Sequence, residues 1–399
     1  QKKGTGQNCI DLISTLVANS LISIGVLLSF RYLGQMNSIK YAFQVAILLS
    51  IWACKSEPKE IIQVPEESFV TFSDPEPPVK EQGMVWIPGG EFTMGTNDPT
   101  AYDAEKPAVN VEVSGFWMDE TEVTNAQFAE FVKATGYLSV AEREISWEEL
   151  KKQLPPGTPK PDDAALQPGS LVFSPPTQPV PLTDISQWWV WKIGANWKHP
   201  EGPESSIEGK ENHPVVHMAF EDAEAYAKWA GKRLPTEFEW EFAARGGVNG
   251  KRFAWGDELT PEGKFLANTF QGNFPNRNEG SDGYLGTSPV KAFQANTFGL
   301  FDMIGNVWEL TSDWYDALKY ARIAGHAPKL DAGMNPCYNP NNPYAMERVI
   351  KGGSFLCAAN YCVNYRPSAR QGHAFDSGTS NVGFRLVKDA SKTKSTSAL

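Results

Sequence analysis

Glycine and proline occur so often along this chain that long helices and long strands have little room. The 399 residues include 34 glycines and 29 prolines, and beyond residue 250 short apolar runs alternate with Gly, Asn and Pro. Because proline interrupts helices and strands and glycine favours turns, this pattern favours short elements joined by loops. We predict a single α+β domain with few helices, short strands and much ordered loop, in which tryptophan side chains and bound cations support the loops.

Local patterns predict the few regular elements. Residues 109–117 alternate apolar and polar side chains, as in a half-buried strand. A helix is predicted after Thr124, and Gly136 ends it. A second helix follows Thr236, which forms a capping box with Glu239, and ends at Gly246. Weaker helical patterns cover 146–153 and 220–230, and the proline-studded stretch 138–187 is predicted to be mostly surface loop.

Composition and charge exclude several functions. The formal net charge is −11 at pH 7, whereas nucleic-acid surfaces need clustered Lys and Arg, so we expect no nucleic-acid partner. The chain contains neither a Walker loop nor a Gly-rich dinucleotide fingerprint. Five cysteines are too few for a disulfide scaffold.

Residues 36–54 have the layout of a signal peptide. A lysine precedes the apolar run 41–52, which is shorter than the roughly 20 residues of a membrane span. The segment ends in IWAC and resembles a bacterial lipoprotein signal, in which the cysteine is lipidated. We therefore expect an exported membrane lipoprotein that faces the periplasm or the exterior and is anchored only through Cys54. An ordinary signal peptide or a misplaced gene start is the alternative.

The segments on either side of this signal are not expected to belong to the domain. Residues 1–35 lack an initiator Met and hold a second apolar run, so we interpret them as upstream translation. Residues 55–83 are rich in Pro and Glu, which favours an extended tether, with an arm lying on the domain as the alternative. The folded part is expected to span 84–388, followed by a disordered tail at 389–399.

Cys357 and Cys362 lie five positions apart in the segment GGSFLCAANYC. A disulfide between them would close a small loop and stabilise the fold only modestly. Structural zinc needs four N or S ligands, and only Cys337 and scattered histidines are available. Two thiolates without further strong ligands suit a soft, low-coordinate ion such as Cu(I), and a catalytic dithiol is equally consistent with them. The residues alone leave a disulfide and a functional dithiol about equally favoured.

Three long blocks of the sequence are MVWIPGGEFTMG (84–95), DETEVTNAQF (119–128) and residues 213–247. They resemble the formylglycine-generating enzymes, which mature sulfatases and have a C-type-lectin-like fold, in parts that the non-catalytic relatives share. Three further blocks resemble segments typical of active members: WWVWKIGANWKHPEGPESSI (188–207), GGSFLCAANYCVNYR (352–366) and DSGTSNVGFR (376–385). The resemblance covers about residues 84–388.

The resemblance implies a copper- and oxygen-dependent reaction. A cysteine in a Cys-x-Pro-x-Arg motif of a sulfatase polypeptide would be oxidised to Cα-formylglycine, through hydrogen removal from its β-carbon and hydrolysis of the resulting thioaldehyde. Cys357 and Cys362 would hold Cu(I), and the substrate thiolate would join them. The other implied site residues are Ser354 and Tyr361 as catalytic residues, and Asn381 and Trp308 as substrate contacts. We expect a monomer.

The resemblance also implies two Ca²⁺ sites built largely from loop oxygens. The first would use the side chains of Asn268 and Asp282 and the carbonyls of Thr269 and Tyr284. The second would use the Asp302 side chain and the carbonyls of Met303, Gly305 and Val307. Without the resemblance, each segment would be interpreted as an Asx-rich turn.

Some positions depart from the family pattern. Ala358 stands where many active members have His, Gly378 replaces a common serine, and residues 374–375 replace a Thr-Pro pair. These changes affect the expected peptide preference more than the oxidation. The positions of two disulfides found in some members hold Ala227 with Leu386 and Ala244 with Pro367, so we expect no structural disulfide.

Two other functions on the same fold remain to be weighed. A non-catalytic surface lipoprotein, used for binding or gliding-type motility, is the rival to the enzyme, and the presence of both cysteines with Ser354 favours the enzyme. Iron-dependent sulfoxide synthases carry a His-x3-His-x-Glu motif. Here Ala219 replaces the Glu after His213 and His217, and Pro214 argues against a helical pair of histidines.

Overall fold

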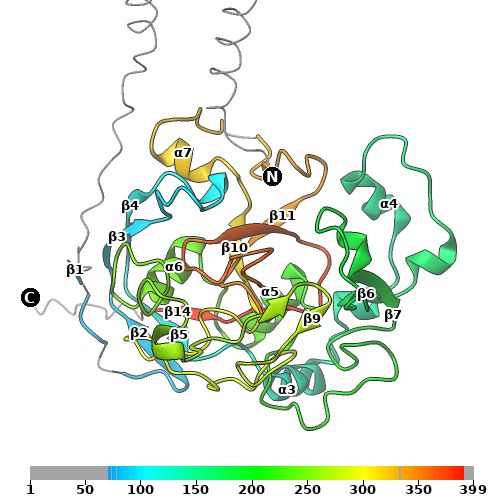
Figure 1. The fold of residues 1–399 in the computed structure, drawn as a ribbon, viewed down its shortest axis with the longest axis horizontal. Helices are drawn as coiled ribbons and strands as arrows, with labels where there is room; N and C mark the ends of the chain where they lie inside the picture. Colours follow the sequence, from blue (N-terminus) through cyan, green and yellow to red (C-terminus); the bar gives the residue numbers. More distant parts are fainter. Residues whose placement is uncertain (1–70, 73, 78, 332–333, 391–399) are drawn as a thin grey trace, which may run out of the picture. The chain divides into compact units, whose positions relative to one another are not determined.

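The computed structural model describes residues 71–72, 74–77, 79–331 and 334–390. The expectations for residues 1–54, including lipidation at Cys54, and for the tail beyond residue 390 lie outside the described residues. The described part is an α+β domain with few helices, short strands and long ordered loops, which confirms the predicted fold class (Figure 1). None of the described helices is both long and apolar enough to cross a membrane.

Two three-stranded antiparallel sheets bring the start and the end of the domain together. In the first sheet, β5 (Phe116–Asp119) lies between β2 (Met84–Ile87) and β14 (Val387–Asp389). In the second sheet, β3 (Gly90–Met94) lies between β1 (Thr71–Phe72) and β4 (Val109–Val113). β1 pairs with β3, and the backbone N–H of Gly115 donates to Asp74 Oδ2 at 2.6 Å. These two contacts place the described part of the segment 55–83 on the domain.

A four-stranded sheet carries the candidate site. Its strands, in spatial order, are β12 (Arg370–Ala374), β11 (Glu347–Lys351), β10 (Trp308–Trp314) and β13 (Val382–Gly383). β10, β11 and β12 are antiparallel, whereas β13 runs parallel to β10 with Val382 opposite Trp308. The loop 352–369 therefore joins two adjacent strands, and the segment that precedes β13 returns next to the start of β10. Two hairpins complete the strands: β6 (Gly169–Phe173) with β7 (Trp189–Ile193), and β8 (Gly272–Asn273) with β9 (Arg277–Asn278).

Two of the three longer helices begin and end where their capping residues predict. The Thr124 side chain accepts a hydrogen bond from the N–H of Gln127 at the start of α3 (Asn125–Thr135), and Gly136 ends this helix with a φ of 70°. Thr236 and Gly246 bound α6 (Glu237–Arg245) in the same way. The remaining helices are α5 (Phe220–Trp229), the short α4 (Trp147–Leu150) and α7 (Lys319–Ile323), and 3-10 turns at 103–105, 140–142, 151–153, 163–166, 185–187 and 261–263.

Buried ion pairs fix α6 against the four-stranded sheet. Glu237 Oε1 accepts from Arg370 Nε at 2.7 Å, and Glu241 Oε2 accepts from Lys351 Nζ at 2.9 Å. Burial alone would raise the pKa of Glu237, but Arg370 and Lys319 outweigh it and hold the pKa below its usual range. Because removing one partner would leave an uncompensated buried charge, these pairs fix the position of the helix beneath strands β11 and β12.

The structure differs from the predicted elements at two places. The predicted strand 109–117 is two strands, β4 and β5, because the chain turns at Gly115. A Cβ at Gly115 would lie 2.4 Å from Cζ2 of Trp86, so this turn has no room for a side chain. The proline-rich stretch 138–187 contains the strand β6, whose pairing partner β7 is distant enough in sequence to leave no local signal.

Candidate active site

Cys357 and Cys362 lie in the loop that joins β11 to β12. Their Sγ atoms are 2.9 Å apart, and neither cysteine is in a disulfide. Two tight turns bring them together, since the N–H of Cys357 donates to Ser354 O at 2.8 Å and that of Cys362 to Ala358 O at 3.0 Å. Gly353 starts the loop with a φ of 74°, and a Cβ there would lie 2.9 Å from Asn364 O. The loop therefore presents a pair of adjacent thiols rather than a structural crosslink.

The two thiols have opposite electrostatic environments. Cys357 is 1% exposed, and burial raises the pKa of its thiol well above the usual range, with a further rise from Cys362. The hydrogen bond from Cys357 lowers the pKa of Cys362, although burial opposes this effect. Asn364 Nδ2 also donates to Cys362 Sγ at 3.3 Å. Cys362 is thus the thiol that ionises first, and the only one of the two that solvent reaches appreciably.

A chain of hydrogen bonds leads from Ser354 to Thr379 through Asn381. Asn381 Nδ2 donates to Ser354 Oγ at 3.0 Å, and Thr379 Oγ1 donates to Asn381 Oδ1 at 2.8 Å. The N–H of Leu356 also donates to Ser354 Oγ, at 3.3 Å. The Ser354 hydroxyl in turn acts to lower the pKa of Cys357, which places this hydroxyl next to the buried thiol. The structure therefore brings Ser354 and Asn381 to the cysteine pair, although they come from different segments.

Aromatic side chains form the wall beside Cys362. The ring of Tyr361 stacks on Phe274 with centroids 4.6 Å apart and an angle of 4°, and the edge of Trp188 meets it at 5.6 Å. Tyr361 is 36% exposed, so it presents one part of its ring to solvent next to the thiols. Ala358, where many active members of the family have His, is fully buried and packs in the same hydrophobic cluster as Phe270.

Trp308 lies deeper than a substrate contact requires. Its side chain is 4% exposed and packs in the same hydrophobic cluster as Cys357. Its backbone N–H donates to Asn381 O at 2.9 Å. In this structure the Trp308 backbone holds the backbone of Asn381, and the Trp308 ring is buried and does not line an open surface.

The four residues of the first expected calcium site lie together in one loop cluster. Asp282 Oδ2 accepts from the N–H of Thr269 at 2.9 Å, and Asp282 Oδ1 accepts from the N–H of Tyr284 at 3.0 Å. Gln271 donates to both Asp282 and the carbonyl of Thr269. The Oδ1 atom of Asn268 is buried and has no hydrogen-bond partner among the described residues. A buried oxygen without a hydrogen-bond partner, in a loop cluster that also contains a carboxylate and backbone carbonyls, fits a cation of the calcium type.

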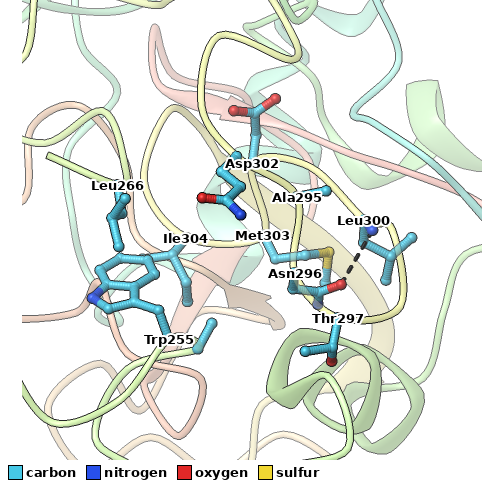
Figure 2. A pocket seen from close by; sticks show the side chains of 11 residues that line it. Trp255, Leu266, Ala295, Asn296, Thr297, Leu300, Asp302, Met303 and Ile304 are labelled. Carbon is cyan, nitrogen blue, oxygen red and sulfur yellow. Dashed lines mark hydrogen bonds between the residues drawn. The ribbon is translucent and has the colours of Figure 1, made fainter. Parts of the chain in front are cut away.

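The second expected calcium site, in the loop that contains Asp302, is also in contact with Asn268. Residues 302–307 form a tight loop in which Asp302, Gly305 and Asn306 have φ values of 54°, 81° and 53°. The backbone N–H of Asn306 donates to Asn268 O at 2.9 Å, and Asp302 Oδ2 accepts from the N–H of Lys291 at 2.7 Å. Burial raises the pKa of Asp302 to about 6. An adjacent pocket of about 210 Å³ is lined by Trp255, Leu266, Met303 and others, and Figure 2 shows the Asp302 carboxylate at its edge, pointing away from Trp255.

Glu122 lies next to Asp302, and the sequence had not singled it out. Its Oε1 atom accepts from Asn306 Nδ2 at 3.0 Å, while Oε2 makes no hydrogen bond among the described residues and lies 3.9 Å from Nη2 of Arg385. Burial, and then the charge of Asp302, raise the pKa of Glu122 well above its usual range. Burial and the charge of Asp302 both disfavour the ionised form of Glu122, and a cation bound at the Asp302 loop would offset both effects.

His213 and His217 do not form a joint metal site. His213 Nδ1 contacts Thr287 Oγ1 at 3.0 Å, whereas His217 contacts Ser170 Oγ and Pro200 O, both at 2.8 Å. Within the described residues, no three His, Cys, Asp or Glu side chains are grouped as metal ligands. The sulfur atoms of Cys357 and Cys362 therefore remain as the candidate ligands for a soft metal ion.

Sequence reasoning also missed Tyr102, Tyr365 and the Glu105–Arg366 pair. Burial, followed by the charges of Cys362 and Cys357, raises the pKa of Tyr102, which comes from a distant segment. Burial raises the pKa of Tyr365 to about 12, again with contributions from both thiols. Arg366 binds Glu105 through two hydrogen bonds of 2.7 Å and acts to lower the pKa of Cys362. The sequence offered one signal for Tyr365 and Arg366, namely their position just after Cys362, and none for Tyr102 and Glu105.

An α+β domain with two adjacent free thiols beside a serine–asparagine pair is the arrangement that the resemblance implies for formylglycine-generating enzymes. Residues 71–390 match the sulfatase-modifying factor enzyme 1-like domain, and the chain belongs to this family.

Named relatives agree with this assignment. The formylglycine-generating enzyme of Mycobacterium tuberculosis is 48% identical over 310 residues, covering 77% of this chain and 97% of that protein. The formylglycine-generating enzyme of Thermomonospora curvata is 46% identical over 312 residues, covering 77% and 94%. A Bos taurus protein named inactive C-alpha-formylglycine-generating enzyme 2 is 36% identical over 312 residues, covering 77% and 89%. The predicted family is confirmed.

Proposed function

We propose that this protein is an active formylglycine-generating enzyme that oxidises a cysteine in a Cys-x-Pro-x-Arg segment of a sulfatase polypeptide. The observation that carries the proposal is the pair of free thiols, Cys357 and Cys362, with sulfur atoms 2.9 Å apart in a chain of this family. Support also comes from the higher identity to relatives named as enzymes, 48% and 46%, than to the relative named inactive, 36%.

Cys357 and Cys362 suit Cu(I) better than other metals. The donor set is two sulfur atoms without a third His, Cys or carboxylate ligand in the described residues, and soft thiolates at low coordination number favour Cu(I). Bound there, Cu(I) would supply the one-electron chemistry with oxygen that no side chain can supply. Cys362, with its lowered pKa, would enter as the first thiolate, and the buried Cys357 would lose its proton on binding.

The overall reaction balances with a thiol reductant. The substrate cysteine gives up two electrons as its Cβ–H and S–H bonds are lost, and an external dithiol supplies two more. These four electrons and the accompanying protons reduce O₂ to two molecules of water. One water then replaces sulfur at the β-carbon, so the products are the aldehyde, H₂S, one net water and the oxidised reductant.

The surrounding side chains would position the reactants. Ser354 Oγ already accepts two hydrogen bonds, so its remaining O–H can only donate toward an oxygen or sulfur atom at the site. The exposed part of the Tyr361 ring offers an apolar surface to the peptide next to Cys362. Calcium at the Asn268 and Asp302 loops would hold the segment behind these groups, and Glu122 would complete the second cation site.

Export as a monomeric lipoprotein anchored at Cys54 remains part of the proposal. Labelled palmitate should be incorporated into the full chain and should be lost in Cys54→Ala, whereas unchanged labelling would contradict the anchor. The released domain should elute in light scattering at the mass of a single chain.

The proposal is tested by sulfatase activation in cells. The full chain would be co-expressed with a sulfatase carrying Cys-x-Pro-x-Arg, in a host that makes no formylglycine of its own. We expect sulfatase activity and an aldehyde on the motif with the wild type and with Cys337→Ala, a matched cysteine variant outside the pair. We expect neither with Cys357→Ala. Activity with Cys357→Ala, or none with the wild type, would favour the non-catalytic lipoprotein.

A further inference from the structure

The hydrogen-bond chain at the site continues beyond Asn381 to a residue that has no assigned role. Thr379 Oγ1 donates to Asn381 Oδ1 at 2.8 Å, and Asn381 Nδ2 donates to Ser354 Oγ at 3.0 Å. All three side chains are buried, so water does not compete appreciably for these bonds. No described hydrogen bond joins Thr379 to either cysteine. Thr379 follows Gly378, whose backbone carbonyl accepts a hydrogen bond from Ser170 Oγ.

The direction of this chain decides what Ser354 can do. An asparagine side chain has an acceptor end and a donor end of nearly the same shape, so its partners decide which end faces Ser354. In the observed direction, Ser354 Oγ accepts from both Asn381 and the N–H of Leu356, so its own proton is directed into the site, where the Cys357 sulfur is its neighbour. With the amide reversed, Ser354 would donate that proton to Asn381 Oδ1 and would have none for a reactant.

Thr379 selects the observed direction. Its hydroxyl makes one hydrogen bond among the described residues, the donation to Asn381 Oδ1. If the amide were reversed, the Thr379 proton would be buried without an acceptor, which is costly, and the Asn381 backbone could not turn to compensate. That backbone is held because the N–H of Trp308 donates to Asn381 O at 2.9 Å.

The backbone of Thr379 is fixed independently of its hydroxyl. The N–H of His217 donates to Thr379 O at 3.0 Å. Ser170 Oγ donates to the preceding carbonyl, that of Gly378, at 2.7 Å, and the N–H of Ser380 donates to Leu171 O at 3.0 Å. Replacing the hydroxyl by a methyl group should therefore change the amide direction without moving the segment.

We propose that Thr379 is a positioning residue that fixes the Asn381 amide, so that the Ser354 hydroxyl donates its proton only into the site. The inference rests on the proposed function for its kinetic consequence. The reactant that Ser354 would serve is an electron-rich oxygen or sulfur atom next to the cysteine pair.

A double-mutant cycle separates this role from general stability. Thr379→Val, Ser354→Ala and the double variant would be assayed in the full, Cu(I)-loaded chain with a Cys-x-Pro-x-Arg peptide. Thr379→Val should lower kcat/KM about tenfold, the effect of one lost positioning hydrogen bond. In the Ser354→Ala background the same change should have less than about a twofold effect, because the residue through which Thr379 acts is gone.

Two further variants serve as controls. Thr379→Ser retains the hydroxyl and should stay within about threefold of the wild type. Thr311→Val removes another buried threonine hydroxyl, which donates from β10 to Val349 O in β11 at 3.0 Å and is not part of the candidate site. It should lower the melting temperature about as much as Thr379→Val does, with kcat/KM unchanged.

The Asn381 side-chain amide can also be observed directly. In asparagine-selective ¹⁵N labelling, its NH₂ signal is assigned by its loss in Asn381→Asp. Thr379→Val and Ser354→Ala should both shift this signal, and Thr311→Val should not. An equal tenfold loss in both backgrounds, or an NH₂ signal unchanged in Thr379→Val, would overturn the inference. If the wild type forms no aldehyde, the proposed function fails while the NMR arm still decides the role of Thr379.

Discussion

The Sγ atoms of Cys357 and Cys362 lie 2.9 Å apart, yet the protein drives their pKa values in opposite directions. Cys357 is buried, whereas Cys362 is partly exposed and receives a hydrogen bond from Asn364. A pair of thiols in which one sulfur ionises and the other stays protonated is prepared to bind a metal in two steps.

The asymmetry predicts the order of alkylation in the metal-free protein. Iodoacetamide at pH 7.5 should modify Cys362 at least about tenfold faster than Cys357, because the thiolate is the nucleophile. Cys357→Ala removes the hydrogen bond that lowers the pKa of Cys362 and should slow the labelling of Cys362. Peptide mass spectrometry over a time course measures both rates, and faster labelling of Cys357 would contradict the assignment.

Calcium is predicted to stabilise the fold through Asp282. The Asp282 carboxylate accepts hydrogen bonds from the backbone N–H groups of Thr269 and Tyr284. In the same candidate site, the Oδ1 atom of Asn268 has no hydrogen-bond partner among the described residues. Adding Ca²⁺ to chelator-treated protein should raise the melting temperature, since a ligand that binds only the folded state stabilises it. Asp282→Ala should lose at least half of that rise. Asp184→Ala removes another turn carboxylate, which accepts from the N–H of Ser186 and is not among the expected calcium ligands, and it should keep the full response. An equal response in both variants would argue against the site.

His217 predicts a pH-dependent contribution to stability. Burial lowers the pKa of His217 to about 4 in the folded protein, against 6.5 unfolded. Because the pKa is lower in the folded protein, the neutral His217 contributes fully to folding stability above pH 6.5. This contribution, about 3 kcal/mol at most, is lost as the pH falls from 6.5 to 4. Asp222 acts in the opposite direction, since burial raises its pKa to about 6, so the wild-type curve alone is not diagnostic.

The variant His217→Asn isolates the histidine contribution. Asparagine tolerates the φ of 63° at this position but cannot reproduce both ring hydrogen bonds. The melting temperature of the variant should fall below that of the wild type at pH 7, and the difference should narrow by pH 4.5. A difference that stays constant over this range would show that His217 is not the group responsible.

Gly378 predicts a steric limit next to the site. A Cβ there would lie 2.2 Å from the carbonyl carbon of His217, so the serine of the family pattern does not fit without a backbone shift. Gly378→Ser should destabilise by about 1–3 kcal/mol and lower peptide turnover, because the same backbone carries Thr379. Gly286→Ser, with no atom within 4 Å of the added Cβ, is the matched control and should change neither denaturant midpoint nor turnover.

Local signals in the sequence predicted much of the fold. Thr124, Gly136, Thr236 and Gly246 bound their helices because capping depends on neighbouring residues only. The break in the predicted strand 109–117 was missed because it depends on the approach of Trp86 to Gly115, a tertiary contact.

The candidate site was predictable only where its residues are close in sequence or fit the family pattern. Glu105 and Arg366 pair across 261 positions, and nothing near either residue indicates the other. The pKa values of Tyr102 and Glu122 are likewise raised by burial and by charged groups from distant segments, so their own sequence neighbours do not indicate a role. The direction of the Asn381 amide depends on the partners at both its ends, which no single segment contains.

The most direct test of the central claim is aldehyde formation in a purified system. The full chain, loaded with Cu(I), would be incubated in air with a dithiol and a Cys-x-Pro-x-Arg peptide, and the cysteine followed by mass spectrometry with aldehyde trapping. We predict conversion by the wild type, none by Cys357→Ser or Cys362→Ser, and undiminished conversion by Cys337→Ser. A wild type that binds Cu(I) at the pair but leaves this cysteine and those of related peptides intact would contradict the account.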